Sequence, residues 1–157
     1  MDNSEIWVDR KDFKDTTIVT TELGRLVDGD IRVRIDKFGL TANNVGYALS
    51  GDMIGYWRYF PADGRRGKVP AWGIAEVIES KSADIEPGER LYGFFPMASH
   101  LDLTPGNIKA GTFEDETNIL KMDINGKLFK ASLYEVLGSE NAKASPEDLY
   151  KLRELDA

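Results

Sequence analysis

Alternation of apolar and charged residues is the clearest pattern in the chain. Residues 31–38 (IRVRIDKF) alternate with a period of two, which predicts a half-buried strand whose Arg32, Arg34 and Asp36 face water. Residues 18–21 (IVTT), 69–80 (VPAWGIAEVIES), 90–96 and 100–103 also favour strands, with Gly- and Pro-containing turns between several of them. The residues expected in the interior are Ile31, Val33, Ile35, Val77, Ile78, Leu91 and Phe94.

Helical signals are fewer and shorter. Residues 41–44 (TANN) favour a helical turn, with Thr41 or Asn43 as its cap. Residues 132–137 (SLYEVL) predict a further turn or two of helix. A Ser-Pro-Glu-Asp helix start at 145–148 precedes a stripe of leucines, and Asn125-Gly126 between strand-like residues predicts a hairpin. We therefore expect a mainly β (α+β) domain over residues 1–130 and a helical tail over 131–157 packed on it.

Composition and charge restrict the function. The 157 residues carry a net charge of −7, which disfavours binding to nucleic acid or to an anionic membrane surface. There is no cysteine and one histidine, His100, so disulfides, thiolate metal sites and His-His metal pairs are excluded. No stretch has the length and apolar character of a signal peptide or membrane span, which favours a cytoplasmic protein.

Three stretches of sequence carry a resemblance to known proteins. They are residues 33–52 (VRIDKFGLTANNVGYALSGD), residues 55–61 (GYWRYFP) and residues 69–101, which begin VPAWGIAEV. Together they resemble DUF2855, a bacterial family of unknown function, over most of the chain. More distantly, the order of strands and turns is similar to the GroES-like domain of the medium-chain dehydrogenase/reductase superfamily.

The distant resemblance implies a GroES-like, partly open β-barrel with short helices and a C-terminal helix. It implies the zinc-free, quinone-reductase-like branch, because neither residues 42–44 (ANN) nor 71–73 (AWG) offer the metal ligands of the zinc enzymes. No Gly-x-Gly-x-x-Gly turn of a Rossmann domain occurs, and the chain ends about where that domain should begin. We therefore expect no cofactor to be bound autonomously, and NADPH only with a separate nucleotide-binding domain.

Four residues are candidates for catalysis. Asn43 and Asn44 lie where the superfamily places active-site residues, and Tyr47 follows them; the alternative for the asparagines is a structural role in a cap or turn. His100 is the one side chain whose ordinary pKa is near neutrality, and the alternative is a structural histidine at the start of a strand.

An aromatic segment supplies the candidate ligand pocket. Tyr56, Trp57 and Tyr59, with Trp72, have the apolar bodies and polar tips typical of pockets, although such residues also build cores and interfaces. Nearby cations could receive a phosphate or form a solvated loop. They are Arg58, Arg65, Arg66 and Lys68. Glu76, in an apolar strand, is a candidate acid or base if it points inward, and an exposed edge residue otherwise.

Three functions remain open at this point. The first is a stand-alone or truncated substrate-side domain of a zinc-free NADPH-dependent reductase, which binds a small carbonyl compound. The second is a non-enzymatic module for self-association or for a partner protein, through residues 56–60 or the C-terminal helix. The third is a lyase or isomerase without cofactor, in which His100 or Glu76 transfers the proton.

Overall fold

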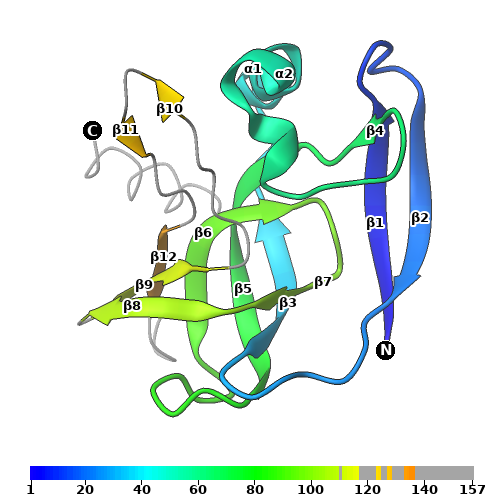
Figure 1. Ribbon diagram of the computed structural model, residues 1–157. Helices are drawn as coiled ribbons and strands as arrows, with labels where there is room; N and C mark the ends of the chain where they lie inside the picture. The colour runs from blue at the N-terminus through cyan, green and yellow to red at the C-terminus, as the bar shows by residue number, and fades with distance from the viewer. Residues whose placement is uncertain (110, 117–122, 125–126, 129–132, 137–157) are drawn as a thin grey trace.

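The fold is mainly β with few helices, as the sequence predicted (Figure 1). The computed structural model describes residues 1–109, 111–116, 123–124, 127–128 and 133–136. None of the helices in this part of the chain combines the length and apolar character needed to cross a bilayer.

The helical elements lie between the third and fourth strands. They are α1 (Ala42–Leu49), α2 (Gly51–Ile54) and the 3-10 turn η1 (Tyr56–Arg58). The strands before residue 100 are β1 (Asp2–Asp9), β2 (Thr16–Glu22), β3 (Ile31–Phe38), β4 (Arg66–Gly67), β5 (Pro70–Ser80) and β6 (Arg90–Pro96). The later strands are β7 (His100–Leu103), β8 (Pro105–Lys109), β9 (Thr112–Asp115), β10 (Asp123–Ile124), β11 (Lys127–Leu128) and β12 (Leu133–Val136).

A seven-stranded sheet forms the body of the molecule. Its strand order is β7-β3-β5-β6-β12-β9-β8, and no pairing among the described residues joins β7 to β8, so this sheet is not a closed barrel. One face of the sheet carries the main core cluster. The predicted interior residues Ile31, Val33, Ile35, Val77, Leu91 and Phe94 are all buried.

Two residues of the central strands differ from the prediction. Ile78 is only half-buried, because successive residues of a strand point to opposite faces and its neighbour Val77 faces the core. Arg32 does not face water and is 4% exposed. Its guanidinium makes two hydrogen bonds to Asp102 on β7, of 2.7 and 2.8 Å, and lies 3.6 Å from Glu79 on β5.

A three-stranded sheet of order β2-β1-β4 lies beside the larger one. The segment after β6 connects the two sheets: Ile6 donates its amide to the carbonyl of Met97 at 2.9 Å, and Ser99 donates to Ser4 at 2.9 Å. A second apolar cluster, which includes Val8, Trp57 and Met97, fills the space between β1, the helices and β5. The N-terminal hairpin is therefore part of the packed domain.

The helix after β3 begins where predicted, and of the two candidate caps it is Thr41, not Asn43, that caps it. The Thr41 hydroxyl accepts from the Asn43 amide at 3.2 Å, and the Asn44 side chain accepts from the Thr41 amide at 2.7 Å. This reciprocal pair satisfies two amides that the first helical turn leaves without partners. The cap thereby fixes the start of helix α1 after β3.

The C-terminal third contains a strand where a helix was predicted. Residues 133–136 form β12, which pairs with Tyr92 and Leu91 of β6 and with β9. The β-branched and aromatic members of this segment suit a strand once two neighbouring edges are present. The pairing of β10 with β11 fits the predicted hairpin. Asn125-Gly126 and the helix predicted after Ser145 lie outside the described residues.

Candidate functional site

Six aromatic side chains from α1, η1, β5 and β6 gather on one face of the seven-stranded sheet. We call this group the aromatic cluster: Tyr47, Tyr56, Tyr59, Trp72, Tyr92 and Phe94. Phe94 is at its centre, with ring contacts to Tyr47, Tyr56, Tyr59 and Trp72. Four of the six were candidate site residues from the sequence, and Tyr92 was not.

Strand register positions the floor of the aromatic cluster. Trp72 lies directly opposite Phe94 in the β5–β6 pair, and their ring centroids are 5.0 Å apart. Trp72 also stacks on Tyr92 at 5.5 Å, with 21° between the ring planes. Because side chains alternate along a strand, these rings face away from Leu91 and Phe95 of the main core cluster. The central strands are thus covered on both faces.

The helical segment supplies the three tyrosines that surround Phe94 in the aromatic cluster. Tyr47 of α1 meets Phe94 edge to face, at 5.4 Å and 82°. Tyr56 and Tyr59 are three residues apart in a 3-10 turn, whose period places them on the same side, and they stack at 5.9 Å and 20°. Tyr59 also meets Phe94 edge to face, at 5.5 Å.

The polar tips of these side chains remain accessible. Tyr47, Tyr56, Tyr59 and Trp72 are half-buried, while Phe94 is buried. Burial raises the pKa of Tyr59 to about 12, helped by Tyr56, and burial also raises the pKa of Tyr56. Within the described part of the chain, the hydroxyls of Tyr47, Tyr56 and Tyr59 make no hydrogen bond. These hydroxyls are therefore available to donate to a ligand.

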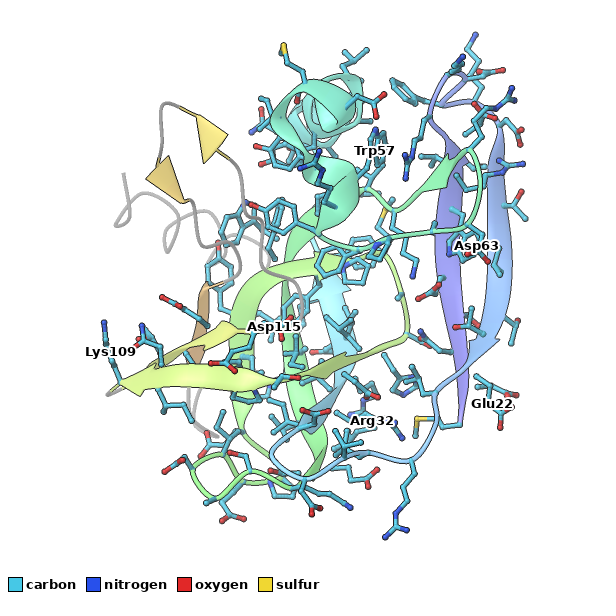
Figure 2. The ribbon with its side chains drawn as sticks, in the orientation of Figure 1. Glu22, Arg32, Trp57, Asp63, Lys109 and Asp115 are labelled. Carbon is cyan, nitrogen blue, oxygen red and sulfur yellow. The ribbon has the colours of Figure 1, made fainter. Side chains whose placement is uncertain are left out.

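Trp57 belongs to a different environment from the other predicted pocket residues (Figure 2). It is 3% exposed and its ring lies between Gly51 and Gly67. Phe13 lies 6.5 Å from its ring, and the guanidinium of Arg10 lies over the ring at 5.7 Å. Because the glycines leave space only for the indole, Trp57 is a packing residue of the second apolar cluster.

The two asparagines differ in surroundings. Asn44 is buried, accepts from the Thr41 amide and donates to the Pro70 carbonyl at 2.9 Å, so it ties α1 to β5. Asn43 is exposed on the first turn of α1. Of the proposed catalytic set on this helix, only Tyr47 contacts the aromatic cluster through a ring.

His100 lies elsewhere, at the start of β7 and opposite Arg34 of β3. Its amide donates to Asn3 at 2.9 Å, and its Nδ1 lies 3.0 Å from the Ser99 hydroxyl. Burial lowers the pKa of His100, and the charges of Arg32 and Arg34 lower it further. No contact described here joins His100 to the aromatic cluster.

The basic residues after η1 are largely neutralised. Arg65 donates to Asp9 at 2.7 Å, Arg66 lies 3.1 Å from Asp15, and Lys68 lies 2.9 Å from the buried Glu5. These cations hold the loop against the N-terminal hairpin. The charge of each of these three cations is therefore balanced by a carboxylate.

Glu76 is also in an ion-pair network. It is half-buried, 2.6 Å from Arg34 and 3.7 Å from Arg90. Arg90 in turn lies 2.6 Å from Asp36. Among the described residues, no group of three or more His, Cys, Asp or Glu side chains is placed to hold a metal ion.

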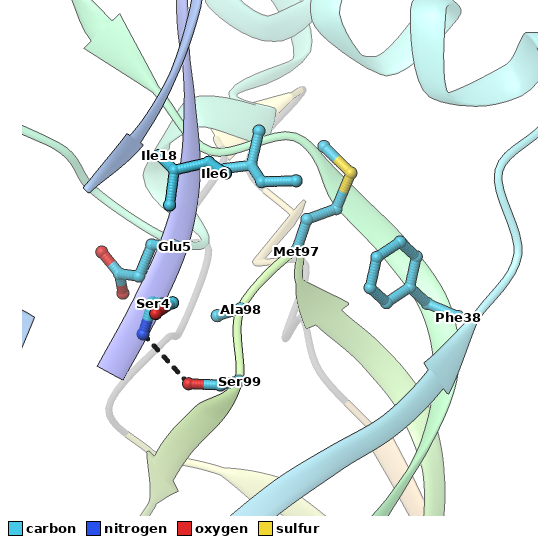
Figure 3. Close-up of a pocket in the computed structure, with 8 residues that line it drawn as sticks. All are labelled: Ser4, Glu5, Ile6, Ile18, Phe38, Met97, Ala98 and Ser99. Carbon is cyan, nitrogen blue, oxygen red and sulfur yellow. Dashed lines mark hydrogen bonds between the residues drawn. The ribbon is translucent and has the colours of Figure 1, made fainter. Parts of the chain in front are cut away.

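An apolar cavity that the sequence did not indicate opens between the N-terminal hairpin and the larger sheet (Figure 3). It has a volume of about 240 Å³. Its apolar lining comes from Ile6, Ile18, Phe38, Met97 and Ala98. These residues lie on β1, β2, β3 and the segment after β6, so no local pattern connects them.

Comparison with known proteins places the chain in a family. No curated protein matches it. The family DUF2855, described as "Protein of unknown function", matches residues 38–124, which is more than half of the chain. The matched region contains the whole aromatic cluster. The chain therefore belongs to the DUF2855 family.

Proposed function

We propose that this protein binds a small carbonyl-bearing ligand at the aromatic cluster. The observation that carries the proposal is the set of three half-buried tyrosines around Phe94 whose hydroxyls have no partner within the described residues. Aromatic rings offer an apolar ligand large contact areas, and a few placed polar groups fix its orientation. The neutral phenols of Tyr56 and Tyr59 would donate to the carbonyl oxygen.

The distant resemblance to the GroES-like domain of the medium-chain dehydrogenase/reductase superfamily indicates a role for such a ligand. We propose that the domain has the GroES-like, partly open barrel of a zinc-free reductase and that the ligand is its carbonyl substrate. The supports are the mainly β sheet and the location of the cluster beside α1, the helix that follows β3. Since Arg65, Arg66 and Lys68 are paired with carboxylates, a nucleotide would be held by another domain or chain.

A pair of matched ligands tests the proposal. Acetophenone and ethylbenzene have similar apolar bodies, but only acetophenone has a carbonyl that accepts a hydrogen bond. Saturation-transfer NMR on the full chain should show acetophenone bound. The Tyr56→Phe/Tyr59→Phe double variant should weaken acetophenone binding about 10-fold and leave ethylbenzene nearly unchanged, because only the hydroxyls are removed.

The control for position is Trp7→Phe. Trp7 lies on β1, outside the aromatic cluster. It should bind both compounds as the wild type does. No acetophenone signal from the wild type, or equal binding by the double variant, would overturn the proposal.

Self-association is a second candidate function, favoured by an apolar surface on α1 and α2. Val45, Leu49 and Met53 are spaced four residues apart and are 55%, 72% and 81% exposed. In contrast, Trp57 and Phe60 of the aromatic segment are each 3% exposed. Sedimentation velocity of the wild type and of Leu49→Glu/Met53→Glu tests this candidate: a dimer that dissociates in the variant supports it, and a monomeric wild type excludes it.

A further inference from the structure

The outer edge of β2 is open. Strand β2 pairs with β1 on one side and is the last strand of its sheet among the described residues (Figure 1). Natural proteins usually protect such edges with short strands, proline, inward charges or a covering element, since an open edge pairs readily with another chain. Strand β2 is seven residues long, and its residues 16–21 (TTIVTT) include no charged residue and no proline.

The alternation of hydrogen-bonded and non-bonded pairs along the β1–β2 ladder shows which backbone groups the edge presents. The Met1 amine and the Leu23 amide donate to each other's carbonyls at 3.1 and 2.9 Å, and the Asp9 amide donates to the Asp15 carbonyl at 2.9 Å. Odd-numbered residues of β2 therefore bond to β1, because hydrogen-bonded and non-bonded pairs alternate in an antiparallel ladder. The amides and carbonyls of Ile18, Thr20 and Glu22 consequently point away from β1.

The apolar cavity adjoins this edge. Ile18 is 74% exposed, lies opposite Ile6 in the β1–β2 register, and lines the cavity together with Phe38 and Met97 (Figure 3). A strand added next to β2 would have a side chain beside Ile18 on the same face. The cavity offers that side chain an apolar seat of about 240 Å³.

Charge indicates what kind of strand fits. Asp2 and Glu22 lie opposite each other at one end of the hairpin, and neither makes an ion pair with a described residue. Glu22 is at the outer end of β2 (Figure 2). Two adjacent carboxylates attract a cation on an incoming chain. The β2 edge of a second copy is a poor occupant, because its sequence TTIVTTE has no Lys or Arg to pair with these carboxylates.

We propose that the β2 edge binds an extended segment of another protein by strand addition. The segment has an apolar or β-branched residue that seats beside Ile18 and a Lys or Arg that lies against Asp2 and Glu22. The backbone groups of Ile18 and Thr20 provide the hydrogen bonds. This interface is independent of the aromatic cluster and of any ligand there.

Two labelled synthetic peptides test the proposal by fluorescence anisotropy with the full chain. The probes are Ac-KTVTVTK-NH2 and its acidic match Ac-ETVTVTE-NH2. The lysine peptide should bind and the glutamate peptide should bind about 10-fold more weakly or not at all. The Glu22→Lys variant should narrow or reverse this preference. Equal binding of both peptides by both proteins would overturn the charge argument.

The backbone contact has its own matched pair of variants. Thr20→Pro removes an outward amide without removing a bond to β1, whereas Thr20→Val keeps that amide. The proline variant should lose peptide binding and the valine variant should retain it. If Thr20→Pro fails to fold, Ile18→Lys, at a site 74% exposed, should weaken the lysine peptide instead. Binding unaffected by these variants, or a wild-type dimer in sedimentation that Thr20→Pro dissociates, would overturn the assignment.

Discussion

The slot around Trp57 gives the sharpest stability prediction. A Cβ atom at Gly67 would lie 2.7 Å from Cζ3 of Trp57, and one at Gly51 would lie 2.7 Å from its Cδ1. Ordinary carbon contacts are about 3.5–4.0 Å, so the indole would have to move by about 1 Å. Trp57 is 3% exposed and packs in the cluster with Val8 and Val69, which restricts that movement.

The expected cost of Gly67→Ala is that of overpacking a filled core, about 1–3 kcal/mol in the free energy of unfolding. For a chain of this size each kcal/mol lowers Tm by about 2–4 °C, so we expect a decrease of about 2–12 °C. Gly46→Ala is the matched control. Gly46 is an exposed residue of α1 with no atom within 4 Å of its Cβ position, so that alanine should stabilise by about 0.4–1 kcal/mol.

Urea unfolding of a double-mutant cycle measures whether the contact is the cause. Trp57→Phe shortens the ring system, so the cost of Gly67→Ala should be smaller in the Trp57→Phe background than in the wild type. A coupling of about 0.5–3 kcal/mol is expected for residues in direct contact. If Gly67→Ala is as stable as the wild type, or costs the same in both backgrounds, the described packing around Trp57 is wrong.

Three further outcomes test other parts of the structure. Asn44→Ala should cost about 0.5–2 kcal/mol in urea unfolding, because a cap and the bond to Pro70 are lost; an unchanged urea midpoint would contradict these two bonds. The NMR titration of His100 should have a midpoint below pH 6.5, because burial lowers its pKa in the folded state. The free energy of unfolding should therefore fall as the pH drops through 6.5, because the unfolded state takes up that proton first. A midpoint at or above 6.5 would contradict the burial of His100. Asp102→Asn should destabilise by about 1.5–3 kcal/mol, measured in urea, because it weakens two bonds to the buried Arg32; an unchanged midpoint would show that this pair contributes nothing.

Local patterns along the chain were sufficient for β2, β3, β5, β6 and β7. The alternation in β3 and the apolar run of β5 reflect burial of strand faces, which is a property of each segment by itself. Thr41 was likewise a recognisable helix cap, because capping depends on residues within one turn. Of the predicted interior residues, Ile31, Val33, Ile35, Val77 and Leu91 belong to the main core cluster.

Contacts between strands that are distant in sequence could not be predicted from local patterns. Arg32 is buried because Asp102, seventy positions later, lies beside it in β7. Residues 133–136 are a strand because β6 and β9 are available on both sides, although their short sequence also suits a helix. Such contacts depend on the order of strands in the sheet, which the residue types within one segment do not determine.

The candidate site was predicted in part for a similar reason. The aromatic segment was recognised, but the 3-10 period separates Trp57 from Tyr56 and Tyr59, so one ring packs in the second apolar cluster and two join Phe94. Tyr92 joins them through its register opposite Ile74 of β5. A pattern of residue types identifies candidates for a pocket, whereas backbone period and register decide which of them meet.

The two proposed binding surfaces should respond differently to salt, and this difference separates them experimentally. The aromatic cluster acts through neutral rings and phenols, whose contacts are insensitive to ionic screening, while the β2 edge relies on Asp2 and Glu22. Raising ionic strength from about 0.05 M to about 0.5 M should therefore weaken the lysine peptide and leave acetophenone binding nearly unchanged. Tyr59→Phe should affect only the ketone and Glu22→Lys only the peptide. If both ligands weaken together in salt, or if either variant alters both affinities, the surfaces are coupled and the assignment of charge to β2 alone fails.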